Sequence, residues 1–131
     1  MRRQRERDTQ PELALRSTLH RQGLRYRVHL RPLAALRREA DIVFTRARVA
    51  VFVHGCFWHG CPDHATWPAT NAAFWRTKIE RNHERDRETR SALEAESWAV
   101  IEVWEHEVTE VAAERVAAIV AARADARAGA P

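Results

Sequence analysis

The stretch Val49-Ala50-Val51-Phe52-Val53 is apolar throughout and rich in β-branched residues. A run of this length and composition predicts a strand buried on both faces, because a half-exposed strand would alternate apolar with polar residues. The residues that follow, 54–71, crowd His, Cys, Trp, Pro and Gly together and predict an irregular loop. The sequence therefore places a loop rich in functional side chains directly after a buried strand.

Upstream of this strand, the pattern predicts one helix and two more strands. The spacing of the leucines indicates a helix over residues 10–22, which Gly23 ends. Residues 24–30 alternate apolar with basic side chains, as in a half-exposed strand. Residues 41–44 form a second short apolar strand.

Downstream of the loop, the sequence predicts a helix, a strand and a last helix. The first helix, over residues 72–95 and capped by Thr70 or Asn71, is expected to turn three apolar side chains inward: Phe74, Ile79 and Leu93. Residues 98–104 predict the strand, and residues 109–126 predict the last helix.

The order helix, three strands, helix, strand, helix predicts an α/β fold, with a central mixed sheet flanked by helices. At 131 residues the chain has the size of one domain, which we expect to span residues 1–131 with a short basic arm at 1–8 and a frayed tail at 127–131. No run approaches the roughly 18 apolar residues of a transmembrane helix. The N-terminus lacks an apolar secretory core, so we expect a cytosolic protein. Nothing in the pattern indicates an oligomer, and we expect a monomer.

The basic residues are distributed unevenly along the chain. Residues 1–48 hold 13 Arg and five acidic residues, whereas residues 49–131 hold eight Arg, one Lys and 13 acidic residues. A GC-rich genome could explain why Arg outnumbers Lys by 21 to one, but it does not explain this asymmetry. The basic half is suited to a polyanionic partner such as DNA, because Arg forks match phosphates and base edges.

Two cysteines and two histidines predict a metal site. Cys56 and Cys61 lie close together in a chain expected to be cytosolic, and His64 follows three residues later, so the cluster indicates zinc before it indicates a disulfide. The fourth ligand has to come from elsewhere, and His106, which follows the strand at 98–104, is the best candidate. The alternative is a pair of reduced thiols beside surface histidines.

Carboxylates and imidazoles supply the catalytic candidates. Asp41 begins a strand in the basic half, where a carboxylate can hold Mg²⁺ against a phosphate, although an Asp that merely ends a turn is the simpler alternative. Glu12 could reach the same site, or it could complete a helix capping box with Thr9. His54 and His59 flank the first cysteine, and either could act as a general base or remain a supporting residue.

Two large aromatic residues, Phe57 and Trp58, lie between the two cysteines. Such side chains can fill a core, or they can present planar surfaces on which bases stack. Composition does not choose between these two roles.

Taken together, these features resemble the very short patch repair (Vsr) DNA mismatch endonucleases. The most distinctive block is Val51-Phe52-Val53-His54-Gly55-Cys56-Phe57-Trp58-His59-Gly60-Cys61-Pro62. Further blocks occur in the same order along the chain, at residues 7–12, 23–27, 41–44, 70–71, 74–75, 85–86 and 103–107. The resemblance covers nearly all of the predicted fold.

The resemblance implies a compact relative of the restriction endonuclease fold with a structural zinc. It implies Mg²⁺-dependent nicking of duplex DNA on the 5′ side of the T in a T:G mismatch, the lesion left when 5-methylcytosine deaminates. The product is a 3′-hydroxyl from which a polymerase can resynthesise a short patch. It also implies a bacterial cytoplasmic enzyme that acts on the nucleoid, with mismatch-repair proteins as candidate partners.

The resemblance also implies a role for each matching residue. Asp41 matches the essential metal-binding aspartate, and the main chain of Val53 is a further metal contact through its carbonyl. His59 matches the residue that activates water, with His54 and Glu12 in support. The zinc ligands would be Cys56, Cys61, His64 and His106. The aromatic residues that wedge into the base stack would be Phe57, Trp58 and Trp75.

Two other functions remain open. A nuclease of the same fold with a different DNA target would keep Asp41 and His59 but show no preference for T:G. A non-catalytic, zinc-stabilised DNA-binding module would not depend on Mg²⁺.

Overall fold

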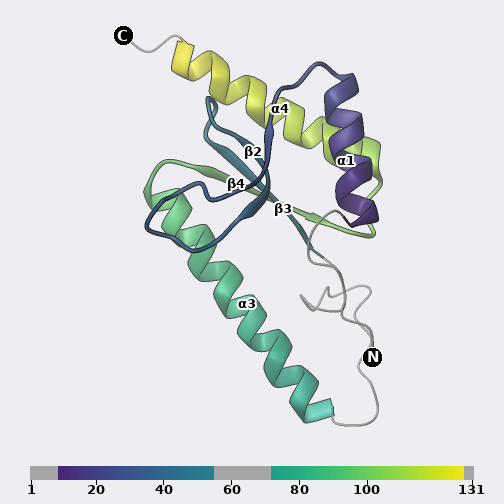
Figure 1. Ribbon diagram of the computed structural model, residues 1–131, viewed down its shortest axis with the longest axis vertical. Helices are drawn as coiled ribbons and strands as arrows, with labels where there is room; N and C mark the ends of the chain where they lie inside the picture. The colour runs from purple at the N-terminus through teal and green to yellow at the C-terminus, as the bar shows by residue number, and fades with distance from the viewer. Residues whose placement is uncertain (1–8, 55–71, 129–131) are drawn as a thin grey trace.

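The computed structural model describes residues 9–54 and 72–128. Within these residues the elements are α1 (Gln10–Arg21), β1 (Arg27–Leu30), β2 (Ala40–Phe44), β3 (Val49–His54), α3 (Ala72–Ala95), β4 (Ala99–Trp104) and α4 (Thr109–Ala128) (Figure 1). None of these helices is long and apolar enough to cross a membrane.

The four strands form one mixed sheet in the order β1-β2-β3-β4. The pairs β1–β2 and β2–β3 are antiparallel, whereas β3 and β4 run parallel and are connected through α3. A parallel neighbour needs a long crossover, and α3 provides it. The sheet therefore brings the C-terminal ends of β3 and β4 to the same edge, with His54 paired to Trp104.

The helices cover both faces of the sheet (Figure 1). On one face, α1 and α4 contribute apolar residues to the larger core, including Leu15, Leu19 and Val116. On the other face, Leu93 of α3 packs into a smaller core with Val43 and Ala50. The functional side chains are thus held between two packed layers.

The predicted α/β class, the mixed sheet and the element order are confirmed. The buried strand is confirmed over Val49, Ala50 and Val51, whereas the last apolar residues of the run are only partly buried. Ile79 and Leu93 face inward as predicted. The predicted zinc loop lies outside the described residues.

Three local predictions were wrong. The strand predicted at residues 24–30 begins only at Arg27, and Tyr26 just before it packs edge-on against Phe44 and donates a hydrogen bond from its hydroxyl to the carbonyl of Arg16. Phe74 is 57% exposed, because the N-terminal part of α3 extends beyond the sheet (Figure 1). Thr9 caps α1 without a side-chain hydrogen bond, so there is no capping box with Glu12.

Candidate active site

Asp41 lies where the ladder between β2 and β3 ends. The last paired residues are Ile42 and Val51. Beyond them the backbone N–H of Val53 donates a hydrogen bond to Asp41 Oδ2 at 2.7 Å. The carboxylate thus satisfies an N–H group that would otherwise lose its partner when the two strands diverge. This contact fixes the direction of the Asp41 side chain relative to the end of β3.

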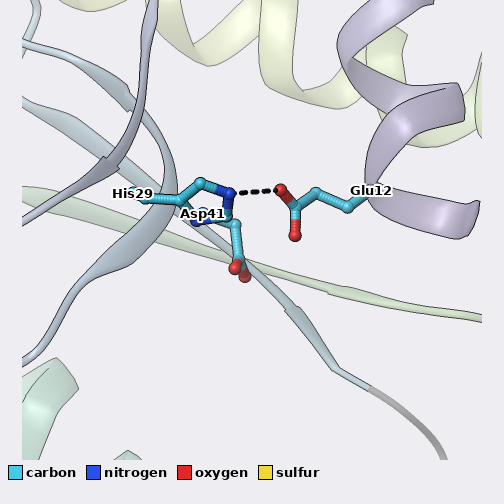
Figure 2. Close-up of side chains that lie close together, drawn as sticks. All are labelled: Glu12, His29 and Asp41. Atoms are coloured by element: carbon cyan, nitrogen blue, oxygen red, sulfur yellow. Dashed lines mark ion pairs between the residues drawn. The ribbon is translucent and has the colours of Figure 1, made fainter. Parts of the chain in front are cut away.

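His29 lies beside Asp41 on the neighbouring strand. The β1–β2 register pairs Val28 with Ile42 and Leu30 with Ala40, which places His29 opposite Asp41. The backbone of His29 has a φ of 49°, a left-handed conformation that is uncommon for a residue other than glycine. The imidazole turns toward α1, where its Nε2 lies 3.2 Å from Glu12 Oε2 (Figure 2).

Glu12 is a buried carboxylate in the first turn of α1, with only 1% of its surface exposed. Its Oε2 is also 3.6 Å from Nη1 of Arg16, one helical turn away. A buried carboxylate is costly unless cationic or hydrogen-bonding groups surround it. Here His29 and Arg16 bring their nitrogens within ion-pair distance of Oε2, although neither forms a hydrogen bond with it.

The environment of Asp41 favours its protonated form. Burial raises the pKa of this carboxyl to about 7, and the neighbouring Glu12 adds to the rise. The hydrogen bond from Val53 and the charge of His29 act in the opposite direction and lower the pKa. Two carboxylates held this close in a buried place repel each other, and a bound cation would relieve that repulsion.

The donor atoms of Glu12, His29 and Asp41 all lie within 4.8 Å of one another. This spacing allows the three side chains to bind a single metal ion. Two carboxylate oxygens suit Mg²⁺ or Mn²⁺, whereas the imidazole nitrogen is a donor that transition metals accept more readily than Mg²⁺ does. The arrangement can therefore hold a divalent cation at the junction of α1, β1 and β2.

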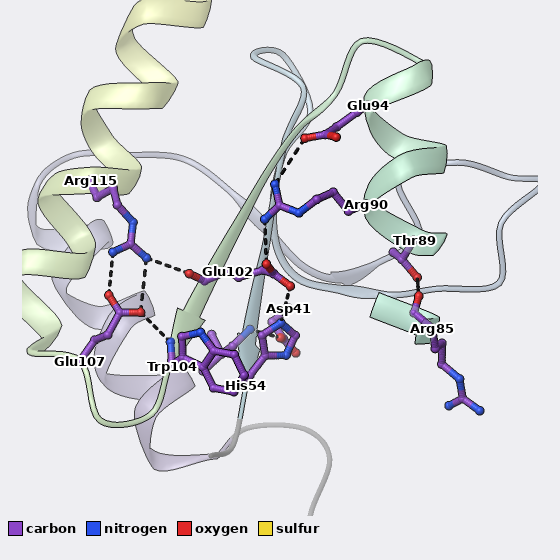
Figure 3. Close-up of polar contacts among 11 residues, drawn as sticks. Asp41, His54, Arg85, Thr89, Arg90, Glu94, Glu102, Trp104, Glu107 and Arg115 are labelled. Carbon is purple, nitrogen blue, oxygen red and sulfur yellow. Dashed lines mark hydrogen bonds and ion pairs between the residues drawn. The ribbon is translucent and has the colours of Figure 1, made fainter. Parts of the chain in front are cut away.

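His54 is the last residue of β3 and is buried. It directly follows Val53, whose N–H contacts Asp41. Its Nε2 lies 3.1 Å from Oε1 of Glu102 on β4, and the indole ring of Trp104 lies 5.1 Å away between ring centres (Figure 3). Arg90 of α3 donates a 2.8 Å hydrogen bond to the other carboxylate oxygen of Glu102. These contacts connect the end of β3 to the helix that covers the sheet.

Glu102 is held in its ionised form. The hydrogen bond with His54 and the ion pair with Arg90 lower the pKa of Glu102 to about 2, although partial burial opposes them. Because the carboxylate is charged, it can only accept hydrogen bonds.

Comparison with known proteins identifies the family. Residues 1–64 match the family model described as DNA mismatch endonuclease Vsr. The chain is 42% identical over 110 residues to a protein named "Type II nicking enzyme V.XorIIP" from Xanthomonas oryzae pv. oryzae, covering 83% of this chain and 79% of that protein. The chain belongs to the Vsr family of DNA endonucleases.

Two further relatives support this assignment. "Type II nicking enzyme V.NaeI" from Lentzea aerocolonigenes is 50% identical over 101 residues, which cover 76% of this chain and 61% of that protein. "DNA mismatch endonuclease Vsr" from Escherichia coli K12 is 43% identical over 103 residues, which cover 76% of this chain and 62% of that protein. The Vsr-family chain thus spans about three fifths of the length of these two relatives.

The structure brings some of the predicted site residues of this Vsr-family chain together. Glu12 and Asp41 share one site, and Val53 contacts it through its N–H, while the predicted role of the Val53 carbonyl stays a prediction. His54 belongs to the neighbouring cluster around Glu102. His59 lies outside the described residues, as do five other predicted ligands and DNA-contacting residues: Cys56, Phe57, Trp58, Cys61 and His64.

The remaining two predicted residues lie at the surface. His106 occupies the turn after β4 and is exposed. Trp75 lies partly buried in the first turns of α3, with its ring 5.2 Å from that of Phe74 in an edge-on arrangement. His106 follows the end of β4, whose last residue pairs with His54, and its role as a zinc ligand stays a prediction.

Three residues of the site escaped the sequence analysis: His29, Arg90 and Glu102. In the sequence, His29 is only one polar residue in an alternating strand. Its position opposite Asp41 depends on the strand register, which the sequence does not reveal. Glu102 could have been identified as a candidate site residue from the sequence, because it is the one charged residue in the otherwise apolar strand Ala99–Trp104. Arg90 is one of many charged residues on α3, and its sequence context does not distinguish it.

Removing the His29 imidazole should destabilise the protein. His29→Ala takes away the partner at 3.2 Å from the buried Glu12 carboxylate, so we expect the free energy of unfolding to fall by about 1–3 kcal/mol. Urea unfolding at pH 7 measures the change. His20→Ala, which removes an exposed histidine from the last turn of α1, is the matched control and should change stability by less than about 0.5 kcal/mol. Equal stability of the two variants would show that the His29–Glu12 pair contributes nothing.

Proposed function

We propose that this protein nicks duplex DNA on the 5′ side of the T in a T:G mismatch, by Mg²⁺-dependent hydrolysis of the phosphodiester bond. The observation that supports this most directly is the geometry at Asp41. In a chain of a DNA mismatch endonuclease family, a partly buried aspartate is fixed by the Val53 N–H and faces a second, fully buried carboxylate, Glu12.

The residues at this site fit a divalent cation. The raised pKa of Asp41 reflects burial and the proximity of Glu12, and both costs are relieved when a cation neutralises the carboxylates. Asp41 would hold the ion, with Glu12 beside it and the carbonyl of Val53 as a further ligand; the imidazole of His29 lies within reach of the same position. When bound, Mg²⁺ supplies positive charge that stabilises the charge developing on the scissile phosphate.

His59 and His54 have different roles in the proposed reaction. His59 takes the proton of the attacking water in this proposal, since a neutral imidazole is an effective base near pH 7. His54 supports it from the end of β3, where its ring is held by Glu102 and lies against Trp104. A structural zinc bound by Cys56, Cys61, His64 and His106 would fix His59 relative to Asp41.

The DNA partner follows from charge and from the aromatic residues. The Arg-rich segment 1–48 provides the cationic surface, and Phe57 and Trp58, with Trp75 on α3, insert into the base stack beside the mismatch. A mismatched step is easier to unstack than a paired one, so the wedge favours T:G over matched DNA.

The chemistry can be tested with an end-labelled T:G duplex, incubated with Mg²⁺ or with EDTA. We expect a single nick 5′ to the T only in the presence of Mg²⁺, and a product that a polymerase extends directly because it ends in a 3′-hydroxyl. Cleavage in EDTA, or a 3′-phosphate product that resists extension, would contradict the proposal.

The aromatic residues should control discrimination more than affinity. Phe57→Ala and Trp58→Ala should reduce the ratio of T:G to C:G nicking by about tenfold, because stacking contributes about 1–3 kcal/mol per base. Their binding to matched DNA should change less, as measured by fluorescence anisotropy. Trp75→Ala should show the same pattern, whereas Val111→Ala, at an exposed apolar position on α4, serves as the control. An unchanged T:G preference in the three variants would assign these aromatics to packing.

The names of the relatives favour one alternative. Two of the three proteins above are named type II nicking enzymes, so a nuclease of the same fold with another DNA target remains the second candidate. It predicts the same dependence on Asp41 and Mg²⁺ without a preference for T:G.

A further inference from the structure

A carboxylate stands in the middle of an apolar strand at the edge of the site. Strand β4 reads Ala99-Val100-Ile101-Glu102-Val103-Trp104, and glutamate is disfavoured in such a half-buried strand unless its charge has partners. The two oxygens of Glu102 are both used. Oε1 lies 3.1 Å from His54 Nε2, and Oε2 accepts a 2.8 Å hydrogen bond from Arg90. The strand thus carries one charged side chain, which contacts both His54 and Arg90.

The sheet register brings these groups together. In the parallel pair β3–β4, Phe52 is paired with Glu102 and His54 with Trp104. Glu102 and His54 are therefore diagonal neighbours two residues apart, close enough for long side chains to meet. Figure 3 shows the carboxylate of Glu102 between the imidazole ring on one side and the Arg90 guanidinium on the other.

We propose that Glu102, clamped by Arg90, is a positioning residue that sets the orientation and the tautomer of His54. An ionised carboxylate can only accept, so the Nε2 that faces it has to carry a proton. Asp86 of α3 also faces this pair, since its carboxylate and the donor atoms of His54 and Glu102 all lie within 4.8 Å of one another. The inference rests on the proposed function, because it assigns the purpose of the clamp to the nicking reaction that His54 supports.

Arg90 completes the clamp from α3, which covers the face of the sheet that carries Phe52 and Val100. It reaches Glu102 from α3 and also lies 3.3 Å from Glu94, one turn along the same helix. The two contacts hold the guanidinium in place, and the guanidinium holds the carboxylate. The orientation of an imidazole at the end of β3 is thereby coupled to a helix that covers the opposite side of the strand from α1.

The first test compares three variants for nicking of the T:G duplex. Glu102→Ala should lower kcat by about 10–100-fold and leave KM within about twofold, since outer partners of site histidines have effects of this size. Glu102→Gln should retain more activity, because its amide oxygen can still accept the Nε2 proton. Glu80→Gln is the matched control: it neutralises an exposed carboxylate elsewhere on α3, and it should nick at the wild-type rate.

The second test reads the tautomer directly and needs no activity. Nitrogen-15 NMR of labelled protein distinguishes the two ring nitrogens of His54, and the wild-type spectrum should show the proton on Nε2. Glu102→Gln should keep this tautomer, whereas Glu102→Ala should shift the population toward Nδ1–H. If Glu102→Ala does not fold, Glu102→Met supplies the same comparison, because it removes the acceptor that faces Nε2 while keeping a side chain of similar length in the apolar strand.

The two tests separate the failure of this inference from the failure of the proposed function. A wild-type kcat in Glu102→Ala, or a His54 tautomer that does not respond to any of these variants, would overturn the positioning role even if T:G nicking is confirmed. If the wild type does not nick T:G but the tautomer responds as expected, the proposed reaction fails and the clamp on His54 stands.

Discussion

Asp41→Asn should abolish nicking of a T:G duplex and at the same time make the metal-free protein more stable above pH 7. Removing the charge should cost at least about a thousandfold in rate, because the anchoring carboxylate of the cation is lost. The asparagine side chain can still accept the N–H of Val53, so the contact that fixes this side chain is retained. Activity and stability should therefore change in opposite directions.

The pH dependence of that stability gain follows from the pKa of Asp41. Its folded-state pKa is about 7, well above the value of about 4 in an unfolded chain. Between these values the folded protein binds a proton that the unfolded chain has released, so the stability contributed by this group is present below about pH 4 and is lost as the pH rises toward 7. The free energy of unfolding therefore falls by up to about 4 kcal/mol over this pH range in the wild type. Asp41→Asn has no ionisable group at this position and should not show this fall.

Urea unfolding in EDTA at pH 4.5 and pH 8 measures this effect. We expect wild type and Asp41→Asn to be nearly equal at pH 4.5 and to separate at pH 8, and we expect added Mg²⁺ to stabilise only the wild type. Glu96→Gln, which neutralises an exposed carboxylate after α3, is the control and should follow the wild type at both pH values. Equal stability of wild type and Asp41→Asn at pH 8 would contradict the raised pKa of the Asp41 carboxyl.

Loss of zinc should be the second large effect. Cys56→Ala removes one of the proposed ligands, and because a structural metal contributes its binding free energy to folding, we expect a loss of about 4 kcal/mol or more and a fall in Tm of about 15 °C. Metal analysis should find one zinc per wild-type chain and none in the variant. Calorimetry with and without a zinc chelator measures the same contribution independently.

Replacing His106 tests the zinc prediction more specifically than replacing Cys56. It is exposed in the turn after β4, so its replacement leaves no buried cavity, and a loss of bound zinc together with a loss of stability in His106→Ala would assign this residue to the metal site. The exposed His20, replaced in the same way, should leave zinc content and Tm unchanged. The proposed zinc site would be contradicted if the wild-type protein contains no zinc, or if the chelator does not change its Tm.

The elements were predictable because their hydrophobic period is strong. The apolar run at residues 49–53 and the spacing of apolar residues on the helices report burial directly, and the structure confirms both. Phe74 shows the limit of that reasoning, because helical periodicity does not reveal that α3 continues past the edge of the sheet. Tyr26 shows another limit, since an alternating pattern cannot distinguish strand pairing from packing against a neighbouring helix.

The site was predictable only in part. Asp41 and Glu12 could be found because each belongs to a recognisable block of sequence. His29, Arg90 and Glu102 could not, because their relation to the site depends on which residues face each other across strands. A shift of the β1–β2 register by one residue would point His29 to the other face of the sheet. Register is set by the whole packed domain and not by the local sequence.

The most direct test of the account uses two end-labelled duplexes that differ only in one pair, T:G in one and C:G in the other. Wild type and Asp41→Asn are compared on both duplexes in Mg²⁺, with each strand labelled in turn. We expect one nick, 5′ to the mismatched T and on that strand alone, and no cleavage by Asp41→Asn. Equal cutting of the matched duplex would contradict mismatch recognition, and cutting by Asp41→Asn would contradict the assignment of the active site.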